Sequence, residues 1–258
     1  MRFKITFKVN KSAYGDSIPI SYQYELSAWI YNIIAKSDSL YATWLHNNGF
    51  SNLNKRFKLF TYSSLAPQCK VIGDRMIVQD TMSLFLSFLP EKSTEEFIKG
   101  VFTDNTFVLG DKKSKVQFHV ENIEVLPYPT FKAHHHIFQT LSPVTVSTKR
   151  NDGSIEYVSP ENESYGSMLI NNLREKYQAF YGKPFSGEEL FIFELLSLPK
   201  SRLITIKANT PAMTKVKGFL YQFKLEADES LMSIMYEAGL GEKNSVGFGM
   251  VEQLKNRI

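Results

Sequence analysis

Four glycines lie in one short segment near the end of the chain, where they could bring a phosphate close to the backbone. They are Gly239, Gly241, Gly247 and Gly249, which form two Gly-x-Gly pairs around Glu-Lys-Asn-Ser-Val. Glycine has no Cβ, so the backbone can adopt positive φ and an anion can approach its amides. Phe248 follows Gly247 in place of lysine and a hydroxyl residue, and the Gly-x-Gly-x-x-Gly spacing is absent. The segment therefore favours a phosphate contact without a mononucleotide cofactor.

Metal chemistry has little support in the sequence. Cys69 is the only cysteine, which excludes a disulfide within one copy of the chain and a cysteine-based zinc site. His134, His135 and His136 are consecutive, and consecutive residues of a strand point to alternate faces, so the three imidazoles cannot face one ion. No pair of carboxylates has the spacing typical of a two-metal nuclease. We expect neither a metal site nor another cofactor.

The elements that must position these residues follow the same order in both halves of the chain. In the first half, alternating polar and apolar residues predict a strand at 2–9, and apolar residues spaced by three and four predict helices at 23–36 and 39–47. Further strands are predicted at 57–62, 69–78, 82–88, 106–109 and 115–125, with a capped helix at 93–102. In the second half, strands are predicted at 137–147, 190–196, 203–207, 216–225 and 247–254, with helices at 162–181 and 229–238.

Each half thus has the order strand, helix, strands, helix, strand, which is the ferredoxin-like order. We predict an α+β protein of two tandem ferredoxin-like (RRM-like) domains, each an antiparallel sheet with both helices on one face. Pro127 and Pro129 disfavour a continuing regular element. They place the boundary near 126–129 and predict domains of residues 1–126 and 127–258.

The distribution of charge is more informative than the net charge of +4. Residues 39–73, 126–151 and 195–225 contain lysines and arginines but no acidic residue, whereas acids gather in segments such as 91–96 and 152–163. Such segregation predicts a basic face that binds a polyanion. Scattered solvated lysines are the alternative that charge alone leaves open.

Residues 238–250, Ala-Gly-Leu-Gly-Glu-Lys-Asn-Ser-Val-Gly-Phe-Gly-Met, closely resemble the C-terminal glycine-rich loop of the CRISPR-associated endoribonucleases of the Cas-six family, within the repeat-associated RAMP superfamily. Similar motifs occur in both halves: Trp-Ile-Tyr-Asn at 29–32, Ala-Thr-Trp-Leu-His at 42–46, Lys-Leu-Phe-Thr-Tyr-Ser at 58–63 and Thr-Leu-Ser-Pro-Val at 140–144. The resemblance implies metal-independent cleavage of CRISPR precursor RNA within its repeats by 2′-hydroxyl attack. The expected products carry 5′-hydroxyl and 2′,3′-cyclic phosphate ends and include guide crRNAs.

Catalytic roles for Tyr31, His46 and Lys58 are implied by this resemblance, because these residues match the family's tyrosine, histidine and lysine. The reaction needs a base for the 2′-hydroxyl, an acid for the departing 5′-oxygen and a cation for the charge on phosphate. The family roles make Tyr31 the activator of the 2′-hydroxyl and His46 the acid. The reverse fits the sequence equally, since imidazole transfers protons in either direction and tyrosine, with an ordinary pKa of about 10, is a less ready base. Lys55 or Arg56 could replace Lys58.

Helical periodicity provides a separate expectation for the orientation of two of these side chains. Tyr31 lies off the apolar stripe of its helix and need not be part of the core. In the next helix, His46 projects away from the side predicted to be buried, so it should face solvent or substrate. That buried side comprises Leu40, Tyr41, Trp44 and Leu45.

The expected partner is CRISPR repeat RNA, with other CRISPR effector-complex proteins as further partners and homodimer formation left open. The RNA contacts are expected from the four glycines of the loop and from basic residues, namely Lys55, Arg56, Lys207, Lys215, Lys217, Lys224 and Lys243. One alternative is a non-catalytic subunit that binds repeat RNA inside an effector complex. Another is a small-molecule enzyme whose glycine loop grips a phosphate metabolite.

The composition predicts a cytoplasmic protein. No stretch of about 18 apolar residues occurs, and the alternating N-terminal residues differ from a signal peptide. The single cysteine suits a reducing compartment.

Overall fold

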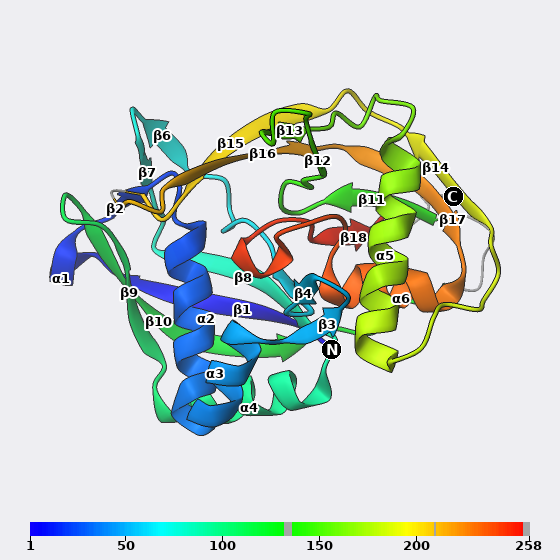
Figure 1. Ribbon diagram of the computed structural model, residues 1–258. Coiled ribbons are helices and arrows are strands. Elements are labelled where there is room, and N and C mark those ends of the chain that lie inside the picture. Colours follow the sequence, from blue (N-terminus) through cyan, green and yellow to red (C-terminus); the bar gives the residue numbers. More distant parts are fainter. Residues whose placement is uncertain (132–135, 209, 255–258) are drawn as a thin grey trace.

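The computed structural model describes residues 1–131, 136–208 and 210–254 (Figure 1). Its first sheet is antiparallel and has the strand order β5-β8-β1-β10-β9. The strands are β1 (Arg2–Asn10), β5 (Phe60–Tyr62), β8 (Thr81–Phe88), β9 (Thr106–Gly110) and β10 (Lys115–Val125). Helices α2 (Gln23–Ser37) and α4 (Glu91–Thr103) pack against each other and cover this sheet.

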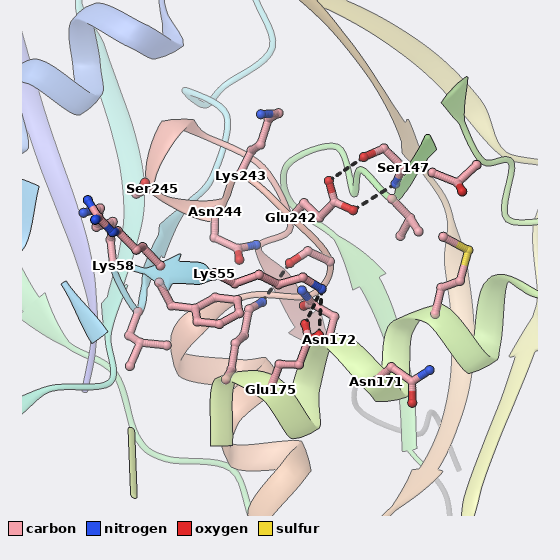
Figure 2. Close-up of a pocket in the computed structure, with 18 of the residues that line it drawn as sticks. Lys55, Lys58, Ser147, Asn171, Asn172, Glu175, Glu242, Lys243, Asn244 and Ser245 are labelled. Atoms are coloured by element: carbon pink, nitrogen blue, oxygen red, sulfur yellow. Dashed lines mark hydrogen bonds and ion pairs between the residues drawn. The ribbon is translucent and has the colours of Figure 1, made fainter. Parts of the chain in front are cut away.

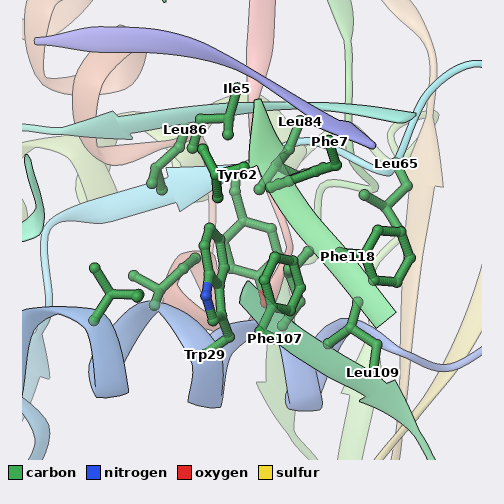
Figure 3. Close-up of a cluster of buried hydrophobic side chains, with 14 of the residues drawn as sticks. Ile5, Phe7, Trp29, Tyr62, Leu65, Leu84, Leu86, Phe107, Leu109 and Phe118 are labelled. Atoms are coloured by element: carbon green, nitrogen blue, oxygen red, sulfur yellow. The ribbon is translucent and has the colours of Figure 1, made fainter. Parts of the chain in front are cut away.

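Alternation along the strands explains why the sheet has one buried face. In β1, Phe3, Ile5 and Phe7 are buried and point toward the helices, while Lys4 and Thr6 point to the other side. Figure 3 shows the resulting cluster, in which Trp29 of α2 lies among aromatic and aliphatic side chains of the sheet. The indole of Trp29 stacks on Phe107 with the ring centroids 4.2 Å apart. This aromatic core fixes α2 on the sheet.

The second sheet has the strand order of the first sheet without the additional edge strand β9. Its strands are β11 (His136–Thr140), β14 (Phe191–Leu195), β17 (Gln222–Ala227) and β18 (Val251–Gln253), in the order β14-β17-β11-β18. Helices α5 (Tyr165–Tyr181) and α6 (Glu229–Ala238) share one hydrophobic core with this sheet. In both halves the first and third strands are central, as the ferredoxin-like order requires. The α+β class with two ferredoxin-like domains is confirmed, whereas the division at residues 126 and 127 stays a prediction.

Several shorter elements surround the two sheets. They are α1 (Lys11–Tyr14), β2 (Ser17–Pro19), α3 (Ser39–Asn47), β3 (Phe50–Asn52), β4 (Lys55–Phe57), β6 (Lys70–Ile72), β7 (Arg75–Ile77), β12 (Ser147–Lys149), β13 (Ile155–Tyr157), β15 (Lys200–Ile206), β16 (Thr214–Leu220) and the 3-10 turn η1 (Asn244–Val246). Strands β15 and β16 form a long hairpin above the second sheet (Figure 1). No helix within the described residues is long and apolar enough to cross a membrane.

Five predicted strands are wrong in extent. Of the segments 137–147 and 247–254, strands β11 (His136–Thr140) and β18 (Val251–Gln253) cover only a part. In the other three the backbone turns within the predicted strand. The segment 69–78 is a hairpin of β6 and β7, with Gly73 at a φ of +60° in its turn. The segment 216–225 divides at Tyr221 into β16 and β17, which belong to different sheets. The segment 57–62 is interrupted at Leu59, whose φ of +53° is incompatible with an extended strand.

Arg2 connects the two halves at the start of β1. Its guanidinium is buried, donates to the carbonyls of Val251 at 2.8 Å and of Tyr236, and lies 3.4 Å from the centroid of the Tyr236 ring. Burial lowers the pKa of Arg2 to about 10, so the side chain remains a cation at neutral pH. This contact fixes the first sheet against α6 and β18.

Candidate active site

Helix α3 packs one side against the core and leaves His46, beside that packed side, exposed to solvent. The carboxylate of Asp38 caps the helix by accepting the Tyr41 N–H at 2.8 Å. Tyr41, Ala42 and Leu45 are buried, and His46, about 100° around the helix from Leu45, is exposed. The predicted orientation of His46 is confirmed.

The predicted buried side of α3 is wrong at two positions. Leu40 is 83% exposed and Trp44 is 39% exposed. The helix has only nine residues and buries a narrow face, so apolar side chains at its margin stay outside the core. Trp44 instead stacks on Tyr41 and meets Phe50 of β3 edge to face.

Tyr31 of α2 lies directly beside His46. The two ring centroids are 5.1 Å apart with an interplanar angle of 80°, and Phe60 of β5 borders the tyrosine ring on another side. Burial raises the pKa of Tyr31 well above its ordinary value, and a side-chain hydrogen bond with Ser245 opposes only part of that effect. The phenol is therefore protonated at neutral pH and able to donate a hydrogen bond.

Lys58 reaches the same place from the loop that follows β4. Its Nζ donates to the backbone carbonyl of His46 at 2.6 Å, and Arg56 donates to the carbonyl of Asn47 at 2.9 Å. Both cations thus satisfy carbonyls at the C-terminal end of α3, where positive charge is favourable. Partial burial, together with the charge of Arg56, lowers the pKa of Lys58 to about 8.

Tyr31, His46 and Lys58 all line one pocket of about 420 Å³. The remaining wall comes from other residues of α2, such as Tyr24 and Ser27, and from the second half of the chain, including Lys243 and Ser245 of the glycine loop. Ser245 has no predicted chemical role, because nothing in the local sequence indicates that it lies near Tyr31. The pocket therefore lies at the seam between the two halves.

A larger groove of about 690 Å³ adjoins this pocket (Figure 2). Lys58, Lys243 and Ser245 line both spaces, so the pocket opens into the groove at these residues. The three acid-free segments meet here: Lys58 comes from the first, Lys149 from the second and Lys207 from the third. The separation of charges along the sequence therefore produces a basic surface in space.

Close packing explains the glycines of the loop. All four are buried, and a Cβ on Gly249, whose φ is +79°, would lie 2.0 Å from the carbonyl oxygen of Leu240. The side chain of Asn244 donates to the carbonyls of Leu240 and Phe248, both at 3.1 Å, and so closes the loop. RNA contact by the glycines stays a prediction, while Lys243 is the loop residue whose side chain is exposed.

Lys176 is not among the predicted functional residues, but it holds the loop from the other side. This lysine of α5 is 1% exposed and donates to the carbonyls of Gly239 at 2.6 Å and Gly241 at 2.8 Å. It follows Leu169 and Leu173 on the buried stripe of the helix, and a lysine at such a position signals a buried partner.

The other basic candidates have different surroundings. Lys215 and Lys217 are exposed on β16, and Lys207 lies in the pocket near the ring of Tyr24. Lys55 lines the groove but pairs with Glu175 at 2.7 Å. Lys224 lies on β17 and pairs with Glu194 of β14 at 3.5 Å, outside both spaces. RNA contact by each of these residues stays a prediction.

The histidine run is only partly described, because His134 and His135 lie outside the described residues. His136 is buried, and its Nδ1 lies 2.8 Å from the side-chain nitrogen of Gln253. Among residues 1–131, 136–208 and 210–254, no group of three histidine, cysteine, aspartate or glutamate residues is placed to hold a metal ion.

The fold and site define a class of protein with two ferredoxin-like domains and a basic groove at their seam. A family model described as CRISPR-associated protein Cas6, N-terminal, matches residues 17–124, and one described as CRISPR associated protein Cas6, C-terminal, matches residues 126–253. The chain belongs to the Cas6 family, which is the Cas-six family that its motifs resemble.

Relatives with known names support this assignment. The CRISPR-associated endoribonuclease Cas6 1 of Methanocaldococcus jannaschii is 32% identical over 93% of this chain and 89% of its own length. The CRISPR-associated endoribonuclease Cas6 of Pyrococcus furiosus is 30% identical over 100% of this chain and 91% of its own length. A solved structure of a Cas6-related protein from Pyrococcus furiosus has the same fold, with a TM-score of 0.84 at 24% identity over 100% of this chain and 99% of that chain.

Proposed function

We propose that the protein is a metal-independent endoribonuclease that cleaves CRISPR precursor RNA within its repeats and thereby generates guide crRNAs. One observation carries the proposal: Tyr31, His46 and Lys58, from α2, α3 and the loop after β4, meet in one pocket that opens into a basic groove. The names of the two relatives, both endoribonucleases, support it.

The proposed reaction is a transesterification within the RNA. The 2′-oxygen forms a bond to phosphorus while its proton passes to a base, and the bond from phosphorus to the 5′-oxygen breaks as that oxygen takes a proton from an acid. Lys58 offsets the negative charge that develops on the non-bridging oxygens. The products are a 2′,3′-cyclic phosphate and a 5′-hydroxyl.

Of the two proton-transfer assignments that the sequence left open, we favour His46 as base and Tyr31 as acid. Burial raises the pKa of Tyr31 and keeps its phenol protonated, which disfavours the phenolate needed for a base. A phenol remains a stronger acid than the ribose hydroxyl that leaves, so it can supply the proton. His46 is exposed beside Tyr31 and can accept the proton of the 2′-hydroxyl.

The proposal is tested by incubating end-labelled repeat RNA with the protein in excess chelator. We expect cutting at a single position in each repeat, with a fragment that shifts in mobility after phosphatase treatment only when acid has first opened a cyclic phosphate. Cleavage that needs added divalent ion would contradict metal independence. RNA that binds tightly but stays intact, with or without metal, would favour a non-catalytic subunit of an effector complex.

The pH dependence of the cleavage rate should follow the charge of Lys58. Its pKa of about 8 lies below the ordinary value, so the ammonium is present below pH 8 and is lost as the pH rises through that value. We expect the single-turnover rate to decline above about pH 8, by up to tenfold for each further pH unit if the cation is essential.

Two variants test this assignment on the same RNA. Lys58→Arg keeps its charge at high pH, so the alkaline decline should disappear. Arg56→Ala removes a repulsive neighbour and should move the decline to higher pH. An unchanged decline in both variants would remove Lys58 from the chemical step.

A further inference from the structure

We propose that Lys243 of the glycine loop is a further catalytic residue, whose ammonium contacts the non-bridging oxygens of the scissile phosphate across from Lys58. The inference rests on the proposed function and assigns a chemical part to the second half of the chain. Lys243 and Lys58 come from opposite halves, and both line the pocket of Tyr31 and His46 as well as the adjoining groove. An RNA strand that passes from the groove into the pocket must pass these two lysines.

The neighbours of Lys243 are held by contacts that leave its own side chain free to project. The Glu242 carboxylate accepts the backbone N–H of Ser147 at 3.0 Å and its hydroxyl at 2.8 Å. Asn244 donates to two loop carbonyls, and the carbonyl of Ser245 accepts the Ser27 hydroxyl at 2.6 Å. Figure 2 shows Lys243 projecting from the loop away from the contact between Glu242 and Ser147. The loop backbone is therefore fixed on both sides of Lys243, and Lys243 is the cation that the loop exposes.

The backbone at Lys243 is in a conformation that lysine rarely adopts. Its φ is +56° and its ψ is +33°, in the left-handed region that glycine occupies without strain. The loop has glycine at four other positions of positive φ, yet carries lysine here. A strained residue held by its surroundings is typical of functional sites. Lysine at this position does not favour the loop conformation, so we attribute its presence to contact with phosphate.

The side chain of Lys243 is also unengaged, in contrast to Lys55 and Lys176 of the groove. Lys55 is paired with Glu175, and Lys176 is buried on two carbonyls. Across the described parts of the chain, the side chain of Lys243 has no ion pair and no hydrogen bond to the protein. Its charge is consequently available to an incoming phosphate without the loss of a protein contact.

The test separates action on the scissile phosphate from general attraction of RNA. Single-turnover rates are measured at saturating protein, and Kd is measured with uncleavable RNA carrying 2′-deoxyribose at the cut. Lys243→Ala should lower the saturated rate about 10²-fold, as loss of one preorganised charge donor does, and Lys243→Arg should recover part of it. Lys113→Ala, an exposed lysine in the turn between β9 and β10, is the matched control and should retain the wild-type rate.

A second variant excludes misfolding as the cause of a slow rate. Lys243→Gly relieves the positive φ, so its Tm should equal or exceed that of the wild type, while its saturated rate should be as low as that of Lys243→Ala. A wild-type saturated rate in Lys243→Ala, with or without weaker binding, would overturn the inference and leave the proposed function intact. Intact repeat RNA after incubation with the wild-type protein would overturn both.

Discussion

A repeat RNA with one 2′-deoxyribose on the 5′ side of the cleaved bond should remain uncut under conditions in which the all-ribose RNA is consumed. The proposed nucleophile is the 2′-oxygen of that nucleotide, and without it no new bond to phosphorus can form. Binding should change little, because one hydroxyl is a small part of an interface dominated by phosphate contacts. The measurement is a single-turnover time course on denaturing gels, with Kd from filter binding.

The matched control carries the 2′-deoxyribose one nucleotide further to the 5′ side. This RNA should be cut at close to the all-ribose rate, since its nucleophile is intact. Cleavage of the first RNA at its modified bond would show that the 2′-oxygen is not the nucleophile and that the proposed reaction is wrong.

His46→Ala should lower the single-turnover rate by about 10²- to 10⁴-fold, the usual contribution of a positioned acid or base. The helix that carries His46 is held by Asp38, Tyr41 and Leu45 on its other sides. The variant should therefore keep its fold, its Tm and its affinity for RNA. Only proton transfer at the scissile bond is removed.

His119→Ala is the matched control for this variant. His119 is also exposed, but it lies on β10 and contacts Thr106. We expect the wild-type rate in His119→Ala. An undiminished rate in His46→Ala would remove His46 from the active site and, with it, the proposed pairing with Tyr31.

Local sequence was sufficient to predict the elements whose signals are short in range. Helix α3 has the predicted bounds of 39–47, and α6 those of 229–238, because capping residues and apolar spacing act within a few positions. The repeated order of elements also predicted the two ferredoxin-like sheets. Where β16 ends and β17 begins could not be predicted, because Tyr221 separates strands whose partners lie far away in sequence.

The candidate site could likewise be predicted only in part from the local sequence. Motif resemblance picked out Tyr31, His46 and Lys58, but their shared pocket is a property of the folded chain. Ser245 is more than 200 positions from Tyr31 in sequence, so no local pattern links them. Charge alone grouped Lys224 with the other lysines, although the sheet register pairs it with Glu194.

The contact of Arg2 with Tyr236 and Val251 has a consequence for how the site is held together. Tyr31 and His46 belong to one ferredoxin-like domain and Ser245 to the other, so the spacing of these groups depends on how the domains dock. Arg2 belongs to the first domain and binds Val251 and Tyr236 of the second domain. Arg2 does not line the pocket, yet its contacts help to hold the distances between the groups that do. Both ferredoxin-like domains are therefore needed to position the residues of the pocket.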